Sequence, residues 1–158
     1  MLISHRSDVN AVDHYGLTPL HLAGVSRVSE RTINLLVQHG ANLDAQDHNG
    51  NTPLHLAARH GLQRAVQQFV RAGCSLNLRN HQGETALHQS VKRILDREAL
   101  LGGGDIVRCL VLAGADTQLV DNNQRTALDI LREHGACYVF PETAHMLQPD
   151  RHFTVNEE

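Results

Sequence analysis

The chain has 158 residues, a formal net charge of −3 and 41% hydrophobic residues, but only 3% aromatics and no Trp. The slight acidic excess argues against a nucleic-acid binder, which needs basic residues against phosphates, and no apolar run of about 18 residues encodes a membrane span. The amino-terminal segment lacks the apolar stretch of a secretory signal, and three cysteines without a CxxC pair suit a reducing compartment. We therefore expect one domain's worth of chain in the cytoplasm or nucleus.

A hexapeptide recurs four times along this chain, as TPLHLA, TPLHLA, TALHQS and TALDIL. The copies begin at Thr18, Thr52, Thr85 and Thr126, so they lie 34, 33 and 41 residues apart. A period near 33 predicts stacked repeats, in which each unit buries its apolar face against the next. Such a stack has a long side surface and no enclosed cleft, which favours partner binding over catalysis.

The chain begins with an incomplete unit. Residues 1–12 are predicted to be the end of a preceding repeat, with Arg6 where a helix-ending Gly is expected. We therefore expect the array to start before the first residue of this sequence. The first full unit, 13–46, opens with a turn and closes with an apolar helix that ends at Gly40.

The second unit, 47–79, carries the clearest local signals. An Asn-Gly pair favours a turn with positive φ, and Thr52 is predicted to cap a helix with Pro53 in its first turn. A second helix has apolar residues at i, i+3 and i+4. It is predicted to end at Gly73, where the left-handed backbone costs little.

The third unit, 80–120, contains an insertion near residues 94–104. Apolar residues at helical spacing predict that its first helix extends to about Leu100. The run 102–104 of three glycines should then break the helix, and Asp105 should cap the next one. Two interpretations of the insertion stay open: a spacer, or a contact surface for a specific partner.

The fourth unit, 121–147, is predicted to be a partial, capping repeat. Asp129 stands where the hexapeptide has His, and Pro141 is unfavourable in a helix interior by about 3 kcal/mol. We expect a short helix that begins near Pro141 and ends by Leu147. Residues 148–158 are predicted to be a flexible tail.

Together these patterns resemble the ankyrin repeat, whose unit is a β-turn finger followed by two antiparallel helices. The resemblance covers about residues 8–136 and implies an all-α solenoid. In that family the hexapeptide His ties neighbouring turns together, so a structural role is implied for His21, His55 and His88.

A second histidine series, His14, His48 and His81, recurs at the tips of successive fingers. Stacked helical layers lie about 8–10 Å apart, whereas zinc needs ring nitrogens about 2.0–2.1 Å from one ion. We therefore predict solvent-facing fingertips and no metal site.

No catalytic motif is present. The sequence lacks GxSxG, HExxH and a Walker-type loop, and the glycine run before Asp105 lacks the Lys and Ser/Thr of a phosphate loop. Cys74 and Cys109 fall at small or apolar positions, as compact hydrophobic residues do. We expect no enzyme activity, no cofactor and no small-molecule substrate.

The resemblance places partner binding on the concave face, formed by the fingers and the exposed side of each first helix. The predicted contact residues are Tyr15, Leu17, Asn49, Asn51, Arg59, His60, Gln82, Glu84, Lys92, Arg93 and Arg125. Tyr15 and Leu17 are predicted apolar anchors. The predicted basic centre, Arg59, Lys92 and Arg93, favours an acidic or phosphorylated segment of another protein or peptide. The alternative is scattered solvated charge without a dedicated ligand.

Two further functions stay open. The chain could be a regulatory or substrate-targeting arm of a larger enzyme or effector, which the full reading frame would decide. Ankyrin-like proteins can also be hydroxylated on an Asn near the repeat junction, and Asn10 and Asn77 lie at suitable positions. A gain of one oxygen mass on either peptide would reveal this modification.

Overall fold

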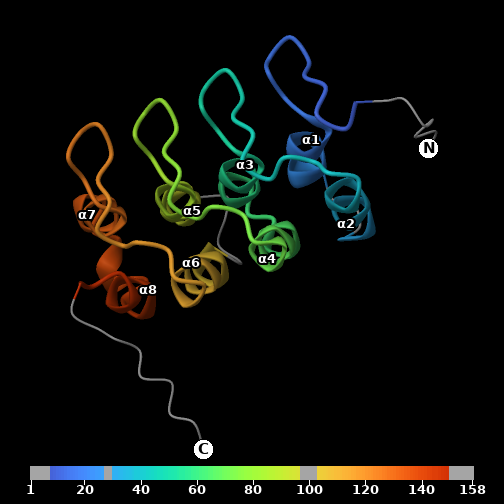
Figure 1. The fold of residues 1–158 in the computed structure, drawn as a ribbon. Coiled ribbons are helices and arrows are strands. Elements are labelled where there is room, and N and C mark those ends of the chain that lie inside the picture. Colours follow the sequence, from blue (N-terminus) through green and yellow to red (C-terminus); the bar gives the residue numbers. More distant parts are fainter. Residues whose placement is uncertain (1–7, 27–29, 97–102, 150–158) are drawn as a thin grey trace, which may run out of the picture.

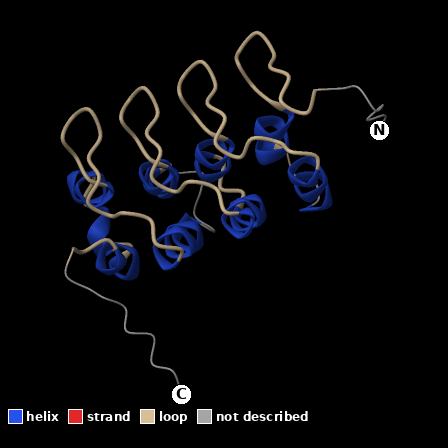
Figure 2. Ribbon diagram, in the orientation of Figure 1, coloured by secondary structure: helices blue, strands red, loops and turns tan. Residues whose placement is uncertain are grey.

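The computed structural model describes residues 8–26, 30–96 and 103–149. Within them the helices, in chain order, are α1 (Pro19–Val25), α2 (Glu30–Gln38), α3 (Pro53–Arg59), α4 (Gln63–Ala72), α5 (Ala86–Leu95), α6 (Gly103–Leu112), α7 (Ala127–Glu133), the 3₁₀ turn η1 (Ala136–Tyr138) and α8 (Pro141–Met146). These described residues contain no strand (Figure 2).

The helices form two rows beneath a row of projecting loops (Figure 1). The inner helices α1, α3, α5 and α7 pack one against the next, and the outer helices α2, α4, α6 and α8 do the same. The loops, which we call fingers 1 to 4, span residues 13–17, 47–51, 80–84 and 121–125. Each finger, with the inner and outer helix that follow it, makes one unit, so the predicted all-α stack is confirmed.

Each inner helix begins at the Thr of a hexapeptide. The Thr52 hydroxyl accepts a hydrogen bond from the His55 backbone N–H, and Thr18 caps α1 in the same way. Pro53 lies in the first turn of α3, where its missing N–H removes no helical bond. The outer helix α4 ends at Gly73, whose φ of 85° is left-handed. These predicted helix boundaries are confirmed.

The fingers pack so closely that glycine is needed at their tips. Gly16 has a φ of 78°, and a Cβ there would lie 2.7 Å from the His48 ring. The backbone N–H of His48 also donates to the carbonyl oxygen of Tyr15, at 3.0 Å. In finger 4 the same position is Gln124, with a φ of 61°. A side chain is tolerated there because no described finger follows.

The core lies between the two rows of helices and is mostly aliphatic, as the sequence predicted. Its fully buried side chains include Leu20, Ile33, Leu54, Phe69, Leu87, Ile106, Leu110, Ile130, Leu131 and Leu147. Phe69 reaches from α4 to α1, where a Cβ on Gly24 would lie 3.2 Å from its ring. Glycine in α1 therefore makes room for this ring.

The hexapeptide histidines connect successive units. The His55 Nδ1 lies 3.1 Å from the Thr52 backbone N, which can only donate, so Nδ1 accepts and Nε2 carries the hydrogen. That Nε2 donates to the Glu84 carbonyl oxygen in the next finger, at 2.9 Å. His21 and His88 make the corresponding bonds to Asn51 and Arg125.

Asp129 replaces this histidine in unit 4. It keeps the hydrogen bonds to the capping Thr but not the one to a following finger. Its Oδ2 accepts from the Thr126 N–H at 3.0 Å and from the Thr126 hydroxyl at 2.8 Å. A carboxylate has no N–H with which to reach a further finger. The substitution therefore suits a unit that has no described neighbour on that side.

The prediction for the insertion in unit 3 is wrong at both of its described ends. Helix α5 stops at Leu95, with Asp96 extended at φ −68° and ψ 119°, so it does not reach Leu100. Helix α6 begins at Gly103, which places Asp105 within its first turn instead of at its cap. Packing of Gly104 near Thr143 of α8 and a carboxylate in the first turn offset the low helix propensity of glycine. The rest of the insertion, 97–102, lies outside the described residues.

Helix α8 begins at Pro141 and ends at Met146, which confirms the predicted short helix. The predicted boundaries of the units stay predictions. Residues 1–7 of the predicted preceding repeat and 150–158 of the predicted tail lie outside the described residues.

Mild acid is expected to destabilise the stack. Burial lowers the pKa of His55 and of His88 below the ordinary 6.5. Protons therefore bind these two histidines more readily in the unfolded chain than in the folded one. Their contribution to the free energy of unfolding is full above about pH 6.5 and decreases as the pH falls below that value. The carboxylates Asp13, Asp121 and Asp129 have pKa values below 3.8 and titrate later.

Thermal melts at about pH 7.5 and about pH 5.5 should therefore show a lower Tm at the acidic pH. That difference should be smaller in His88→Gln, which removes one of the two buried imidazoles. A Tm that is the same at both pH values would contradict the assignment of these two histidines.

Candidate functional site

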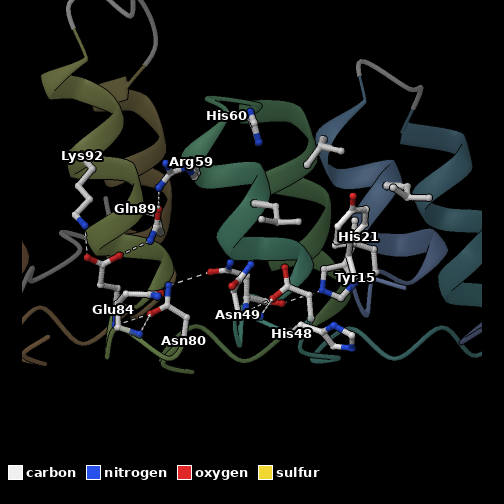
Figure 3. Close-up of a pocket in the computed structure, with 17 residues that line it drawn as sticks. Tyr15, His21, His48, Asn49, Arg59, His60, Asn80, Glu84, Gln89 and Lys92 are labelled. Atoms are coloured by element: carbon white, nitrogen blue, oxygen red, sulfur yellow. Dashed lines mark hydrogen bonds and ion pairs between the residues drawn. The ribbon is translucent and has the colours of Figure 1, made fainter. Parts of the chain in front are cut away.

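The fingers and inner helices of units 1 to 3 form an open groove of about 970 Å³. Figure 3 shows the side chains that line it. The lining residues are Tyr15, Leu17, His21, Leu22, Val25, Asp47, His48, Asn49, Asn51, Leu56, Arg59, His60, Asn80, Gln82, Glu84, Gln89 and Lys92. Of the predicted contact residues, all but Arg93 and Arg125 belong to this lining.

The unit 1 end of the groove is apolar. Tyr15 is 61% exposed and Leu22 is 47% exposed, although most large apolar side chains of the described residues are buried. Leu17, Val25 and Leu56 complete this part of the lining. Because Tyr15 lies on a finger whose backbone is hydrogen-bonded to the next finger, its ring is displayed from a rigid support.

The middle of the groove carries a cation without a carboxylate partner. Among the described residues, no Asp or Glu oxygen lies within 4.0 Å of the Arg59 guanidinium. Its Nη1 donates instead to the neutral Oε1 of Gln89, at 3.2 Å. The other guanidinium donors are therefore available to a ligand. Burial and the charges of Arg59 and Arg93 lower the pKa of the adjacent His60.

A hydrogen-bond relay runs from Arg59 into unit 3 (Figure 3). The Gln89 amide nitrogen donates to the Glu84 carboxylate, and Lys92 donates to the other oxygen of that carboxylate. Because a carboxylate only accepts, Glu84 fixes which end of the Gln89 amide is nitrogen. The Gln89 carbonyl oxygen is thereby turned toward Arg59.

This relay corrects two expectations about the concave face. Glu84 is only 4% exposed, so it does not offer its carboxylate to solvent as a finger residue would. The Glu84 carboxylate forms an ion pair with Lys92, which neutralises both charges. Lys92 is thus not a free cation, and the predicted basic centre is weaker than its composition suggested.

Two other predicted cations are also compensated. Arg125 binds Asp121 through Nη2 at 2.8 Å and Glu133 through Nη1 at 3.0 Å. Arg93 lies outside the groove lining, with Nη1 3.9 Å from the carboxylate of Asp96. Of these predicted cations, Arg59 lines the groove and has no carboxylate partner among the described residues.

Sequence reasoning missed Leu22, Leu56 and Gln89, which share the fifth position of the hexapeptide. A signal was available, because residues two apart on a helix face different directions. The third residue of the motif, such as Leu20, is buried in the core, so the fifth has to face the concave side. The change from Leu to Gln at this position in unit 3 marks the change in groove polarity.

The cysteine and histidine side chains of the described residues were the candidates for reactive or metal-binding groups. Burial raises the pKa of the Cys74 thiol to about 12 and also raises that of Cys109, so neither is a reactive thiolate at neutral pH. No group of three or more His, Cys, Asp or Glu side chains in the described ranges is arranged to hold a metal ion. The fingertip histidines His48 and His81 are exposed, as predicted.

The two candidate hydroxylation residues both make contacts between units. The Asn10 Oδ1 accepts from the Asn42 backbone N–H at 2.7 Å, and its Nδ2 donates to the Gly40 carbonyl oxygen at 3.1 Å. The Asn77 Oδ1 accepts from the Asp116 N–H at 2.9 Å. Modification of these residues stays a prediction.

Comparison with protein-family models identifies a family for this chain. The family model described as ankyrin repeats (3 copies) matches residues 1–80 and 25–101, which together cover more than half of the chain. No curated protein matches the chain. No helix among the described residues has the length and apolarity to cross a bilayer.

The ion pair in the relay gives a stability prediction. Lys92→Met should lower the free energy of unfolding by about 1–3 kcal/mol, because it leaves the Glu84 carboxylate buried without a cation. The double variant Glu84→Gln/Lys92→Met should recover most of that loss. Urea denaturation measures both, with the exposed Arg64→Met as control. Additive losses in the double variant would mean that the pair is not coupled.

Proposed function

This chain belongs to the ankyrin repeat family, and from that premise we propose that it binds a partner polypeptide along its concave groove. Members of the family are generally protein–protein interaction modules and are typically non-catalytic. The observation that carries the proposal is the open groove with exposed apolar side chains at one end and Arg59 in its middle.

The dimensions of the groove suit a chain segment better than a small molecule. It crosses the inner helices α1, α3 and α5, and packed helices lie about 8–10 Å apart, so it spans roughly 16–20 Å. About six residues of extended chain cover that length. Small-molecule sites enclose most of their ligand, whereas this groove is open along its length.

Tyr15 is well suited to anchor the partner. Its ring packs beside that of His14, with the ring centroids 3.8 Å apart, and its backbone is held by the next finger. A tyrosine held in this way loses little conformational freedom when a partner covers it. Exposed Tyr and Arg side chains are also the types that contribute most at protein interfaces.

The electrostatics of the groove favour an acidic segment. Arg59 is available for a charge-assisted, two-point hydrogen bond with a carboxylate or a phosphate. Lys92 and Arg125 contribute little, because their charges are already compensated. Preference for an acidic or phosphorylated residue therefore rests on Arg59.

The same recognition would serve a separate binding module or a regulatory or substrate-targeting arm of a larger enzyme or effector. Both uses place the partner in this groove, in the cytoplasm or nucleus. A catalytic domain elsewhere in the reading frame would favour the second use.

The proposal is tested by capturing partners with the intact chain and identifying them by mass spectrometry. Tyr15→Ala and Arg59→Ala should each weaken capture of the main partner about tenfold, because each removes an exposed anchor of the groove. The matched controls are Tyr138→Ala, at an exposed tyrosine on η1, and Arg64→Ala, on the outer helix α4.

Circular dichroism should show the same helix content in all four variants. If the two groove variants capture the partner as well as the controls do, the concave face is not the binding surface.

A further inference from the structure

We infer that the partner segment places one carboxylate side chain, from Asp or Glu, against Arg59, and that the groove selects this group over a phosphorylated side chain. The inference rests on the proposed function and specifies the chemistry of its ligand. It follows from which guanidinium donors are open and from how many positive charges the groove offers a ligand.

The Arg59 guanidinium is held at one nitrogen and open at the other two. Its Nη1 donates to the Gln89 Oε1, at 3.2 Å. Gln89 is 3% exposed and donates its own amide N–H to Glu84, so this acceptor is fixed in place. The Nε and Nη2 of Arg59 make no hydrogen bond within the part of the chain that the structure describes. Together they form one edge of the planar guanidinium, which a carboxylate can meet with both oxygens.

Arg125 of this same chain shows how such an edge is used. Its Nε and Nη2 both donate to the Asp121 carboxylate, at 3.1 and 2.8 Å, while its Nη1 donates to Glu133 at 3.0 Å. Arg59 is likewise held through Nη1, in its case by a neutral oxygen. The edge that binds a carboxylate in Arg125 is therefore the edge that Arg59 leaves open.

The described lining of the groove offers a ligand one uncompensated positive charge. Lys92 is paired with Glu84, which is only 4% exposed. If Lys92 turned toward a ligand, the Glu84 carboxylate would stay buried without a cation, which is unfavourable. Arg93 does not line the groove, and its Nη1 lies 3.9 Å from the Asp96 carboxylate. Arg59 thus has to balance the charge of the ligand.

This charge balance favours a carboxylate over a phosphate. A phosphorylated serine carries about −1.5 to −2 charges near neutral pH, and proteins recognise such groups with clusters of arginines. A carboxylate carries a single negative charge, which one guanidinium matches. A phosphate would leave negative charge in excess beside Glu84, because only the Gln89 carboxamide separates that carboxylate from Arg59. Asp47 adds a further carboxylate to the lining.

The test begins with a library of random peptides, displayed with their C-termini fused to the carrier protein. The fusion removes the terminal carboxylate, so that only side chains can supply the acid. Peptides selected by the intact chain should be enriched in Asp and Glu, and those selected by Arg59→Glu should be enriched in Lys and Arg. Arg64→Glu, at an exposed position of α4, is the matched control and should select the same peptides as the unchanged chain.

Synthetic forms of the tightest peptide, amidated at the C-terminus, then separate a carboxylate from a phosphate. Fluorescence anisotropy should show that the Glu peptide binds at least about fivefold more tightly than the same peptide with Gln, because Gln cannot accept a charge-assisted two-point bond. The Glu peptide should also bind more tightly than the same peptide with phosphoserine. Phosphoserine binding as tight as that of Glu, or tighter, would overturn the inference.

His60 reports where the carboxylate binds. It lines the groove, and burial, followed by the charges of Arg59 and Arg93, lowers its pKa. A carboxylate at Arg59 offsets one of these charges, so the pKa of His60, followed by NMR, should be higher in the complex with the Glu peptide than in that with the Gln peptide. The two peptides cover the same surface, so the difference isolates the charge. Equal pKa values in the two complexes would place the carboxylate elsewhere and contradict the inference.

Two other results would also overturn it: selected peptides without acidic enrichment, or an Arg59→Ala chain that keeps the preference for Glu over Gln. These results differ from failure of the proposed function. Peptides that bind the unchanged chain and are lost in Tyr15→Ala would still place the ligand in the groove. If no library peptide depends on Tyr15 or on Arg59, the groove is not the binding surface and the proposed function fails with the inference.

Discussion

The groove depends on the hydrogen bond between a buried histidine and the finger of the next unit. His55 accepts at Nδ1 from the first turn of its own helix and donates from Nε2 to the Glu84 carbonyl oxygen. The same bond from His21 to Asn51 fixes finger 2 against α1. Because each bond joins an inner helix to the following finger, the two walls of the groove are held at a set spacing.

Most of the fold could be predicted because its signals are local. A capping Thr, a Pro in the first turn and a Gly at the helix end act within a few residues. The ends of α5 and α6 could not be predicted in this way. Gly103 and Gly104 are poor helix formers, and only the structure shows that Gly104 lies against Thr143 of α8, about forty residues later in the chain.

The candidate site was harder to predict than the fold, because charges act through partners that the sequence does not place. Tyr15 and Arg59 could be selected from their repeat positions alone. The sequence counts Lys92 and Arg125 as two more cations on the concave face, but each is compensated by a carboxylate eight or fewer residues away. Only the structure shows that Glu84 turns inward, where it organises Gln89.

The repeat fixes the geometry of the groove and leaves its chemistry to a few variable positions. The last residues of fingers 1 to 4 are Leu17, Asn51, Glu84 and Arg125, and the matching inner-helix residues are Val25, Arg59, Lys92 and Glu133. Apolar residues thus occupy these two positions in unit 1, whereas in unit 3 and in unit 4 the residues at the two positions form an ion pair within the unit. Unit 2 lies between the apolar unit 1 and the ion-paired unit 3, and its cation, Arg59, has no carboxylate partner among the described residues. The exposed apolar side chains and the uncompensated cation of the groove therefore lie in units 1 and 2, and we propose that these two units determine which partner binds.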